Sequence, residues 1–344
     1  MSAPLTAKGG IGVIGAGAWG TALAQMLASD GRDVALWARE SEVVDAVNND
    51  HRNPVYLPSA SLAPTIRASS DLAEFSALDT LLIVTPAQHL GSIMGELSDY
   101  AGDAVLCAKG IEAGSGRLMA EVARVAAPKA RLSVISGPTF AHEVAAGLPT
   151  AVTLACAGGE AQWQRLSIEI ARPSFRPYYS DDMIGAEIGG AVKNVLAIAC
   201  GVVDGLQLGQ NARAATIARG YAEMLRFGLA RGAQAETLSG LCGLGDLVLT
   251  CSSTSSRNFS LGRALAEGTP AAELMANRRT VAEGAHTAPV LKGLAQDMGI
   301  AMPITEAVCA LLAGETTAPD MVSSVLARPL KSEVEAMPAQ GDTA

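Results

Sequence analysis

The stretch IGVIGAGAWGTALAQMLASDG, residues 11–31, combines a short apolar segment, a glycine-rich turn and a helical pattern. Ile11–Ile14 has the continuous apolar character of a buried strand, and the residues after Gly20 show helical periodicity up to Gly31. A second apolar segment, Asp33–Ala38, predicts the next strand. A GxGxxG pattern between a strand and a helix, inside a βαβ unit, is typical of a dinucleotide-binding domain.

The three glycines of this pattern have separate physical tasks. Gly15 permits the tight turn, Gly17 lets the backbone approach a pyrophosphate, and Gly20 lets the helix pack on the strand. The N-terminus of the helix then presents free N–H groups to the phosphates. An ordinary glycine-rich turn is the alternative interpretation, and the flanking strand and helix argue against it.

The end of the second predicted strand bears on the choice of nicotinamide cofactor. Enzymes that use NAD place Asp or Glu about 20 residues after the glycines to accept from the ribose 2′-OH, whereas an Arg accommodates the 2′-phosphate of NADP. Arg39 stands at the strand end and favours NADP. Glu40 follows it and leaves NAD possible, and Arg39 can also be only a solvated charge.

Three further apolar segments predict buried strands that end in polar or small residues. They are Leu81–Val84, Val105–Ala108 and Leu132–Ile135. In an open parallel sheet the carboxyl ends of the strands form the edge at which ligands bind. Lys109 directly follows the second segment and is a candidate ligand-binding residue, although most lysines are surface charges.

The composition changes from alternating strands and helices to a long helical tract near Ser180–Met183. We therefore expect an α/β protein, with an N-terminal Rossmann-type parallel-sheet domain over residues 1–182. An all-α C-terminal domain is expected over residues 183–332, followed by a frayed tail over residues 333–344.

The segment His51–Pro58, HRNPVYLP, is predicted to be a loop interrupted by prolines. In His51–Pro58 the side chains of Tyr56 and Leu57 either cover the cofactor or serve packing alone. A proline- and aromatic-rich segment, PSFRPYYSDDM at residues 173–183, leads to the domain boundary.

Ile188–Val203, IGGAVKNVLAIACGVV, is an apolar helical pattern with a single formal charge, Lys193. The segment is shorter than the roughly 20 apolar residues of a membrane span, so we expect a helix buried in a protein core. Removing an ammonium group from water is costly unless the group is paired or neutralised. Lys193 therefore either extends to the surface from the first turn or has a function in a buried site.

The second half of the chain contains two glycine-rich segments, Gly205–Gln210 and Ser239–Gly245, which we expect to be loops between helices. Asp246 follows the second, and the hydroxyl-rich run SSTSSRN comes after it at residues 252–258. Serine, arginine and asparagine side chains supply the guanidinium fork and short donors that hold a phosphate, although such runs are also common in solvated loops. Pro303–Gly314 is predicted to be the last helix.

The charge balance argues against two classes of function. With 25 Lys+Arg and 34 Asp+Glu, the net charge is −9, which disfavours binding to nucleic acid or to a membrane surface. The 6 cysteines have no CxxC spacing and the 4 histidines are scattered, so no metal site is expected. Free thiols, and a first segment without an apolar signal core, favour a cytoplasmic location.

Six motifs occur together and in order along the chain. They are GAGAWGTALA (15–24), SGPTFAHEV (136–144), AVKN (191–194), GLCGLGDL (240–247), SSTSSRN (252–258) and VAEG (281–284). The set resembles the family of soluble bacterial NAD(P)-dependent sn-glycerol-3-phosphate dehydrogenases, over about residues 11–315.

The resemblance implies a role for each matching position. Lys193 would be the proton donor and acceptor. The residues that would contact the cofactor are Gly15, Gly17, Ala18, Trp19, Gly20, Arg39, Lys109, Ala141, Arg257, Val281 and Glu283. The residues that would contact the substrate are Lys109, Gly137, Thr139, Lys193, Asn194, Asp246, Thr250, Ser256, Arg257 and Asn258.

The implied activity is the reversible reduction of dihydroxyacetone phosphate to sn-glycerol 3-phosphate, which supplies the backbone for phospholipid synthesis. With Arg39 at the end of the second strand, NADPH is the expected cofactor and NAD is possible, and the low-charge, Ala-rich helical domain favours a homodimer. Negative charge develops on the carbonyl oxygen during reduction, so a cationic Lys193 would stabilise this oxygen and then protonate it. Burial and the nearby charge of Lys109 would lower the pKa of Lys193, and Asp246 would raise it.

Two other functions stay open at this point. One is a different two-domain reductase of the 6-phosphogluconate or β-hydroxyacid dehydrogenase type, from which the segments GLGDL and SSRN distinguish the chain. The other is a non-catalytic NADP-sensing module, which does not require Lys193, Lys109 and Arg257 to converge.

Overall fold

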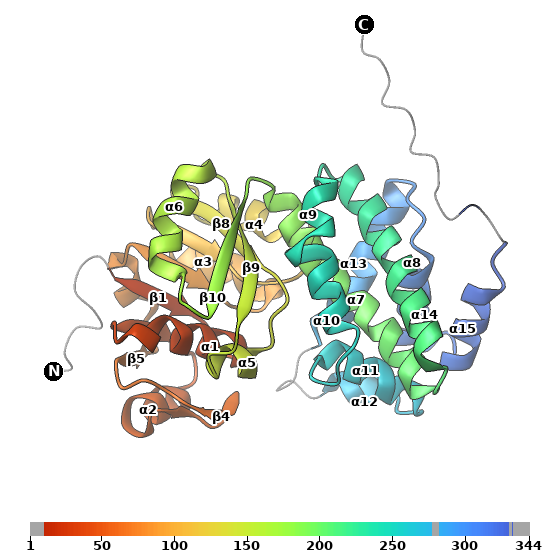
Figure 1. Cartoon of the computed structure of the whole chain (residues 1–344), viewed down its shortest axis with the longest axis horizontal. Helices are drawn as coiled ribbons and strands as arrows, with labels where there is room; N and C mark the ends of the chain where they lie inside the picture. The colour runs from red at the N-terminus through yellow and green to blue at the C-terminus, as the bar shows by residue number, and fades with distance from the viewer. Residues whose placement is uncertain (1–9, 277–281, 330–331, 333–344) are drawn as a thin grey trace, which may run out of the picture.

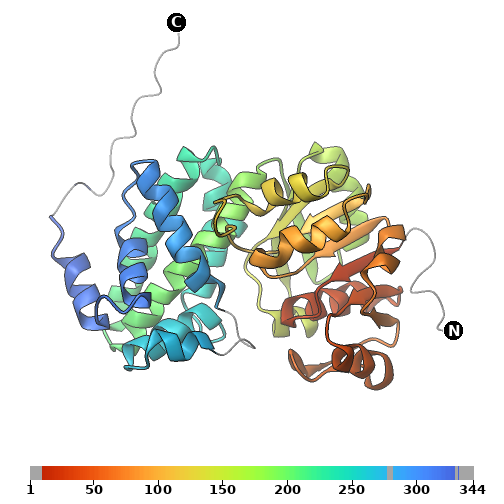
Figure 2. The ribbon, with the colours of Figure 1, turned by 180° about the vertical axis from the view of Figure 1, so that it is seen from behind.

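The structure, a computed structural model, describes residues 10–276, 282–329 and 332. A sheet domain and a helical domain lie side by side in both views of the ribbon (Figures 1 and 2). The long helix α7, Met183–Gly205, begins after the last strand of the sheet and runs through the helical domain. This arrangement confirms the predicted fold class.

One eight-stranded sheet, in the order β10-β9-β8-β7-β6-β1-β2-β5, forms the centre of the first domain. Its strands are β1 (Ile11–Ile14), β2 (Val34–Trp37), β5 (Ile66–Ser69), β6 (Thr80–Ile83), β7 (Asp103–Leu106), β8 (Arg131–Ser136), β9 (Thr150–Cys156) and β10 (Phe175–Ser180). All neighbouring strands pair in parallel except β8 and β9, so the predicted parallel sheet is mixed near one edge. The strand order reverses between β1 and β6, which is the point where open sheets of this kind bind ligands.

Helices complete the sheet domain. They are α1 (Ala18–Leu27), α2 (Ser41–Asp50), α3 (Ala87–Glu96), α4 (Met119–Ala126), α5 (Ala141–Ala145) and α6 (Gly159–Ile170), with 3₁₀ turns at Ala28–Asp30 and Leu72–Ala77. Successive residues of the central strands belong to two different hydrophobic clusters: Val13 and Leu82 lie in one, Ile14 and Leu81 in the other. Because both faces of the sheet are covered, β1 and β6 show continuous apolar sequences rather than alternation.

The segment His51–Pro58, which we predicted to be a loop, contains strand residues. Within and beyond His51–Pro58, β3 (Arg52–Asn53) and β4 (Leu57–Ser61) form a small antiparallel sheet. The proline- and aromatic-rich segment at residues 173–183 contains β10, at the edge of the large sheet. Proline concealed these strands in the sequence, and it is tolerated there because an edge strand has one backbone side without a partner.

The second domain is all-helical and surrounds α7. Its other helices are α8 (Gly209–Ala230), α9 (Ala235–Ser239), α10 (Asp246–Thr250), α11 (Arg257–Ala266), α12 (Ala271–Ala276), α13 (Glu283–Asp297), α14 (Pro303–Leu312) and α15 (Ala318–Leu326). Glycines let α7 and α11 approach closely. A Cβ on Gly201 would lie 2.0 Å from the carbonyl oxygen of Phe259, and one on Gly262 would lie 1.9 Å from that of Ile198.

Two predictions about this domain were wrong. Most of Ser239–Gly245 is helical rather than a loop, because a π-helical turn at Leu241–Gly245 leads into α10. Gly243 makes this packing possible, since a Cβ there would lie 1.9 Å from the carbonyl oxygen of Leu238. The last described helix is α15 rather than Pro303–Gly314, and Thr317 caps its N-terminus.

Helix α7 is long and apolar enough to cross a membrane, the single such helix among the described residues. The apolar part of this helix is completely buried inside the protein, as expected for a core helix. All 6 cysteines are buried and free, as we expected from a sequence without CxxC spacing.

Candidate active site

The glycine-rich loop between β1 and α1 has the geometry that a diphosphate requires. Gly15 has a φ of +116°, and a Cβ there would lie 2.9 Å from the carbonyl oxygen of Val84. Gly20 is still more crowded, since a Cβ would lie 1.8 Å from the carbonyl oxygen of Gly15. Gly17 is different: it precedes α1, provides no side-chain cap, and has no described atom within 4 Å of a Cβ position. The backbone at Gly17 is therefore open to a ligand, and the first N–H groups of α1 have no partner within the helix, so the residues present fit a dinucleotide.

The other cofactor residues predicted in this region lie beside the loop or at the end of β2. Ala18 and Trp19 are the first residues of α1 and are half-buried. Arg39 follows β2 with a side chain that is 78% exposed, and its guanidinium lies 3.1 Å from the carboxylate of Glu40. Both groups that bear on cofactor choice are therefore accessible, and they are paired to each other.

Lys193, Lys109 and Asp246 form one ion-pair cluster. The fully buried carboxylate of Asp246 accepts from the Nζ atoms of Lys193 at 2.5 Å and of Lys109 at 2.8 Å. Thr250 Oγ1 lies 2.9 Å from Lys193 Nζ and 3.2 Å from the same carboxylate. Lys109 Nζ also donates to the carbonyl oxygen of Gly137 at 3.2 Å.

This cluster joins the two domains. Lys109 and Gly137 follow β7 and β8 of the sheet domain, whereas Lys193 lies on α7 and Asp246 begins α10. The strand ends and the buried helix that were singled out in the sequence are thus brought together by polar contacts.

Burial lowers the pKa of Lys193 to about 8; the neighbouring Lys109 adds to this decrease, and the charge of Asp246 opposes it. These directions agree with the sequence-based expectation. Lys193 is only 5% exposed, so it does not extend to the surface. A lysine with this pKa can both donate and accept a proton near neutral pH.

A second polar group links α7, α11 and α13. The amide of Asn258 donates to the side-chain oxygen of Asn194 at 3.0 Å, and its own oxygen accepts from the N–H of Gly284 at 2.9 Å. Ser256 caps α11 by accepting from the N–H of Phe259 at 3.2 Å. The segment SSTSSRN therefore leads into α11, and its last residues form the capped first turn of that helix.

The remaining predicted residues surround these two clusters or lie outside the described part of the chain. Arg257 is the first residue of α11, and its side chain is exposed. Burial raises the pKa of Glu283, whereas the charges of Arg257, Lys109 and Lys193 and the backbone of Ala87, at the start of α3, lower it. Val281 lies outside the described residues.

The segment after β8 provides the last predicted contacts. Thr139 Oγ1 donates to the carbonyl oxygen of Gly137 at 3.3 Å, the same oxygen that accepts from Lys109. Ala141 begins the short helix α5 and is half-buried. A Cβ on Gly137 would lie 2.9 Å from the Cα of Val152, so this turn requires a glycine.

Comparison with known proteins shows the family of the chain. Residues 10–162 match the family described as NAD-dependent glycerol-3-phosphate dehydrogenase N-terminus, and residues 182–323 match the corresponding C-terminus. The chain belongs to the NAD-dependent glycerol-3-phosphate dehydrogenase family.

Relatives from this dehydrogenase family match this chain over nearly its full length. Proteins named glycerol-3-phosphate dehydrogenase (NAD(P)+) from Novosphingobium aromaticivorans and Erythrobacter litoralis are 70% and 68% identical, over 94% of this chain and 98% of each relative. The crystal structure of the glycerol-3-phosphate dehydrogenase from Coxiella burnetii has a TM-score of 0.88 and is 41% identical, covering 93% of this chain and 99% of that one.

One polar residue beside the dehydrogenase site was missed in the sequence. Glu187 on α7 is buried, burial raises its pKa to about 8, and its carboxylate accepts from the N–H of Ala120 at 2.7 Å, in the first turn of α4. It thus fixes the helix that carries Lys193 to the helix that follows the Lys109 segment. A second charge at the edge of the apolar stretch Ile188–Val203 was the available signal.

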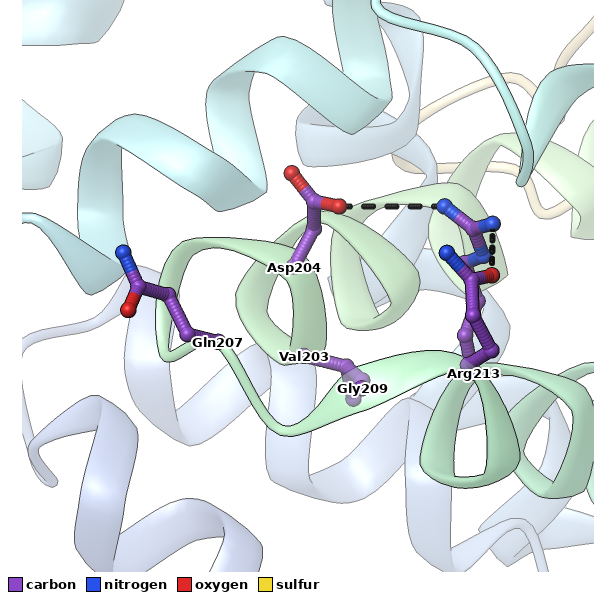
Figure 3. A pocket seen from close by; sticks show the side chains of 6 residues that line it. Val203, Asp204, Gln207, Gly209 and Arg213 are labelled. Atoms are coloured by element: carbon purple, nitrogen blue, oxygen red, sulfur yellow. Dashed lines mark hydrogen bonds and ion pairs between the residues drawn. The ribbon is translucent and has the colours of Figure 1, made fainter.

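Two pockets lie away from the predicted dehydrogenase site. One of about 280 Å³ lies at the turn from α7 to α8, where the carboxylate of Asp204 is 3.7 Å from the guanidinium of Arg213 (Figure 3). Another, of about 440 Å³, lies between α6 and β10. None of the residues predicted for cofactor or substrate lines either pocket.

Proposed function

We propose that this chain catalyses the reversible reduction of dihydroxyacetone phosphate to sn-glycerol 3-phosphate with NAD(P)H, at the cluster of Lys193, Lys109 and Asp246. The single observation that carries the proposal is Lys193, a buried lysine with a lowered pKa that is bound to Asp246 where the two domains meet. The chain also belongs to a family of glycerol-3-phosphate dehydrogenases. The product would supply the backbone for phospholipid synthesis.

Lys193 is the proton donor in reduction and the proton acceptor in oxidation. Bound NAD(P)H supplies the hydride. The Nζ of Lys193 holds its proton beside the developing oxyanion and transfers it, which stabilises the charge and completes the alcohol. Asp246 and Thr250 keep this Nζ in place, because each lies within 2.9 Å of it. Lys109, bound to the other carboxylate oxygen, brings a second positive charge to the site.

Arg257, Ser256 and Asn258 hold the substrate phosphate. The guanidinium supplies a planar pair of donors, and the first turn of α11 adds backbone N–H groups and a favourable dipole. This position compensates locally for the net charge of −9, which would otherwise repel an anionic substrate. Thr139 and Asn194 line the remainder of the site.

The direct test is to mix the purified chain with NADPH and dihydroxyacetone phosphate and to follow NADPH absorbance. Loss of absorbance that depends on both reactants supports the proposal. Stable absorbance would instead favour a non-catalytic NADP-binding module. In the reverse direction, formation of NADPH from NADP with a 3-hydroxyacid, but not with sn-glycerol 3-phosphate, would favour a different two-domain reductase.

The pH dependence of the two directions should have opposite signs. Reduction requires the protonated Lys193, so kcat/KM for dihydroxyacetone phosphate should fall as pH rises through about 8. Oxidation requires the neutral amine, so kcat/KM for sn-glycerol 3-phosphate should rise over the same interval and then level. Initial rates across pH in both directions measure this. A transition near the ordinary lysine value of 10.5 would contradict the assignment.

NADP is the proposed preferred cofactor, and Arg39 is the residue proposed to recognise it. Arg39→Ala should raise KM for NADPH about 10-fold and change KM for NADH less than about 3-fold, because a charge-assisted contact to the 2′-phosphate is lost. Arg176→Ala is a matched control, since this exposed arginine lies on β10 at the opposite part of the sheet. Equal losses with both cofactors would exclude 2′-phosphate recognition by Arg39.

We also propose the domain limits 1–182 and 183–332, a homodimeric assembly and a cytoplasmic location. The start of α7 at Met183 and the family matches on either side support the limits. The 6 free, buried cysteines support a reducing compartment. Sedimentation velocity on the full chain measures the assembly.

A further inference from the structure

Asn53 occupies a position that the proposed reaction does not explain. It lies in β3, in the small sheet between α2 and β5, and its side chain is completely buried. Its amide group donates to the carbonyl oxygen of Ala16 and to Thr21 Oγ1, each at 2.8 Å. Its oxygen accepts from the N–H of Tyr56 at 3.1 Å. The amide group of Asn53 therefore donates both to the loop that joins β1 to α1 and to the first turns of α1.

The contact with Ala16 determines the direction of a peptide group in the diphosphate loop. In a trans peptide the carbonyl oxygen and the following N–H point in opposite directions. Asn53 and the hydroxyl of Thr21, which is 3.2 Å away, both hold the Ala16 oxygen. The N–H of Gly17 is consequently directed away from these two side chains. Gly17 is also the residue of the loop that has no described atom within 4 Å of a Cβ position.

The same small sheet reaches the cofactor-selecting end of β2. The hydroxyl of Tyr56 lies 3.4 Å from the carboxylate of Glu40, which is paired with Arg39. The segment from Asn53 to Tyr56 thus contacts the two parts of the sheet domain assigned to the cofactor, one at the diphosphate loop and one at Glu40, beside Arg39.

We propose that Asn53 is a positioning residue for the dinucleotide, which holds the Ala16–Gly17 peptide in the orientation that receives the diphosphate. The inference rests on the proposed cofactor binding but does not depend on the reaction. It assigns to the small sheet of β3 and β4 the function of holding the loop between β1 and α1 in place.

Asn53→Asp is the sharpest test, because it keeps the shape of the side chain and removes both N–H donors. A carboxylate oxygen would then face the carbonyl oxygen of Ala16, and the peptide would turn. We expect Kd for NADPH, measured by calorimetry without substrate, to rise about 30-fold, the size expected for losing two buried bonds to one loop. At saturating NADPH, kcat and KM for dihydroxyacetone phosphate should stay within about 3-fold of the parent.

Asn48→Asp is the matched control. Asn48 also bonds a backbone in the same domain, donating to the carbonyl oxygen and accepting from the N–H of Ala68 at 2.9 Å each, but it does not touch the cofactor loop. It should lower the melting temperature without changing Kd for NADPH. If Asn53→Asp lowers the melting temperature but also leaves Kd unchanged, its role is structural and the proposal is wrong.

Thr21→Val provides an independent variant if Asn53→Asp does not fold. It removes one of the two acceptors of Asn53 and the second bond to Ala16, so Kd for NADPH should rise about 5-fold, and Thr21→Ser should restore it. Parental affinity in Thr21→Val would overturn the proposal. A parent chain that binds NADPH but does not reduce dihydroxyacetone phosphate would count against the proposed reaction alone, because these affinities are measured without turnover.

Discussion

Replacing Lys193 with alanine should remove nearly all turnover while the protein still folds and binds NADPH. Proton transfer by a positioned side chain is worth about 10²–10⁴ in rate, so we expect kcat to fall by about 10³-fold. The fold should persist because the carboxylate of Asp246 keeps its bonds to Lys109 and Thr250. Steady-state rates, calorimetric NADPH binding and a thermal melt measure the three properties.

Two further variants test whether the loss of turnover in Lys193→Ala comes from the loss of its amine. Lys193→Met fills nearly the same volume without a proton to transfer, so it should match the alanine variant in rate and exceed it in stability. Lys129→Ala removes an exposed lysine whose partner is Asp99 at the surface, and it should behave as the parent. If Lys193→Ala keeps activity within a few-fold of the parent, Lys193 is not the proton donor.

Local sequence patterns were sufficient for the fold class because they report burial directly. The run Ile11–Ile14 is apolar throughout, since both faces of the sheet are covered, and Gly15 and Gly20 after it are required by contacts shorter than 3 Å. The small sheet at Arg52–Ser61 was missed for the opposite reason. Its short strands contain polar residues and a proline, and their pairing depends on the packing of α1, α5 and β4 rather than on local preference.

In the candidate site, too, some features could be predicted from the sequence and others could not. Lys193 and Lys109 stood out because a charge in an apolar helix and a charge at a strand end are both unusual. Their common partner, Asp246, follows a glycine-rich segment whose helical structure depends on contact with α7. A Cβ on Gly189 of α7 would lie 2.4 Å from the carbonyl oxygen of Cys242. Such long-range contacts leave no periodic signal, so the distances between these three residues required the structure.

Asp246→Asn should have the largest combined effect on activity and stability. It leaves two lysines close together in a buried site, and breaking a buried ion pair typically costs about 3–5 kcal/mol. The charge of Asp246 raises the pKa of Lys193, so its removal should move this pKa below about 8. At neutral pH less of Lys193 would then be protonated, and we expect reduction to slow by about 10²-fold.

A matched carboxylate separates this effect from general destabilisation. Asp103 is also nearly fully buried and lies between two cations, Arg131 at 2.8 Å and Arg165 at 2.9 Å, but it belongs to the sheet domain away from the cluster of Lys193, Lys109 and Asp246. Asp103→Asn should lower the free energy of unfolding and leave the pH at which reduction declines unchanged. Asp246→Asn should shift that decline to lower pH. If both variants shift it equally, or neither does, Asp246 does not control the protonation of Lys193, and the buried cluster would serve domain assembly rather than proton transfer.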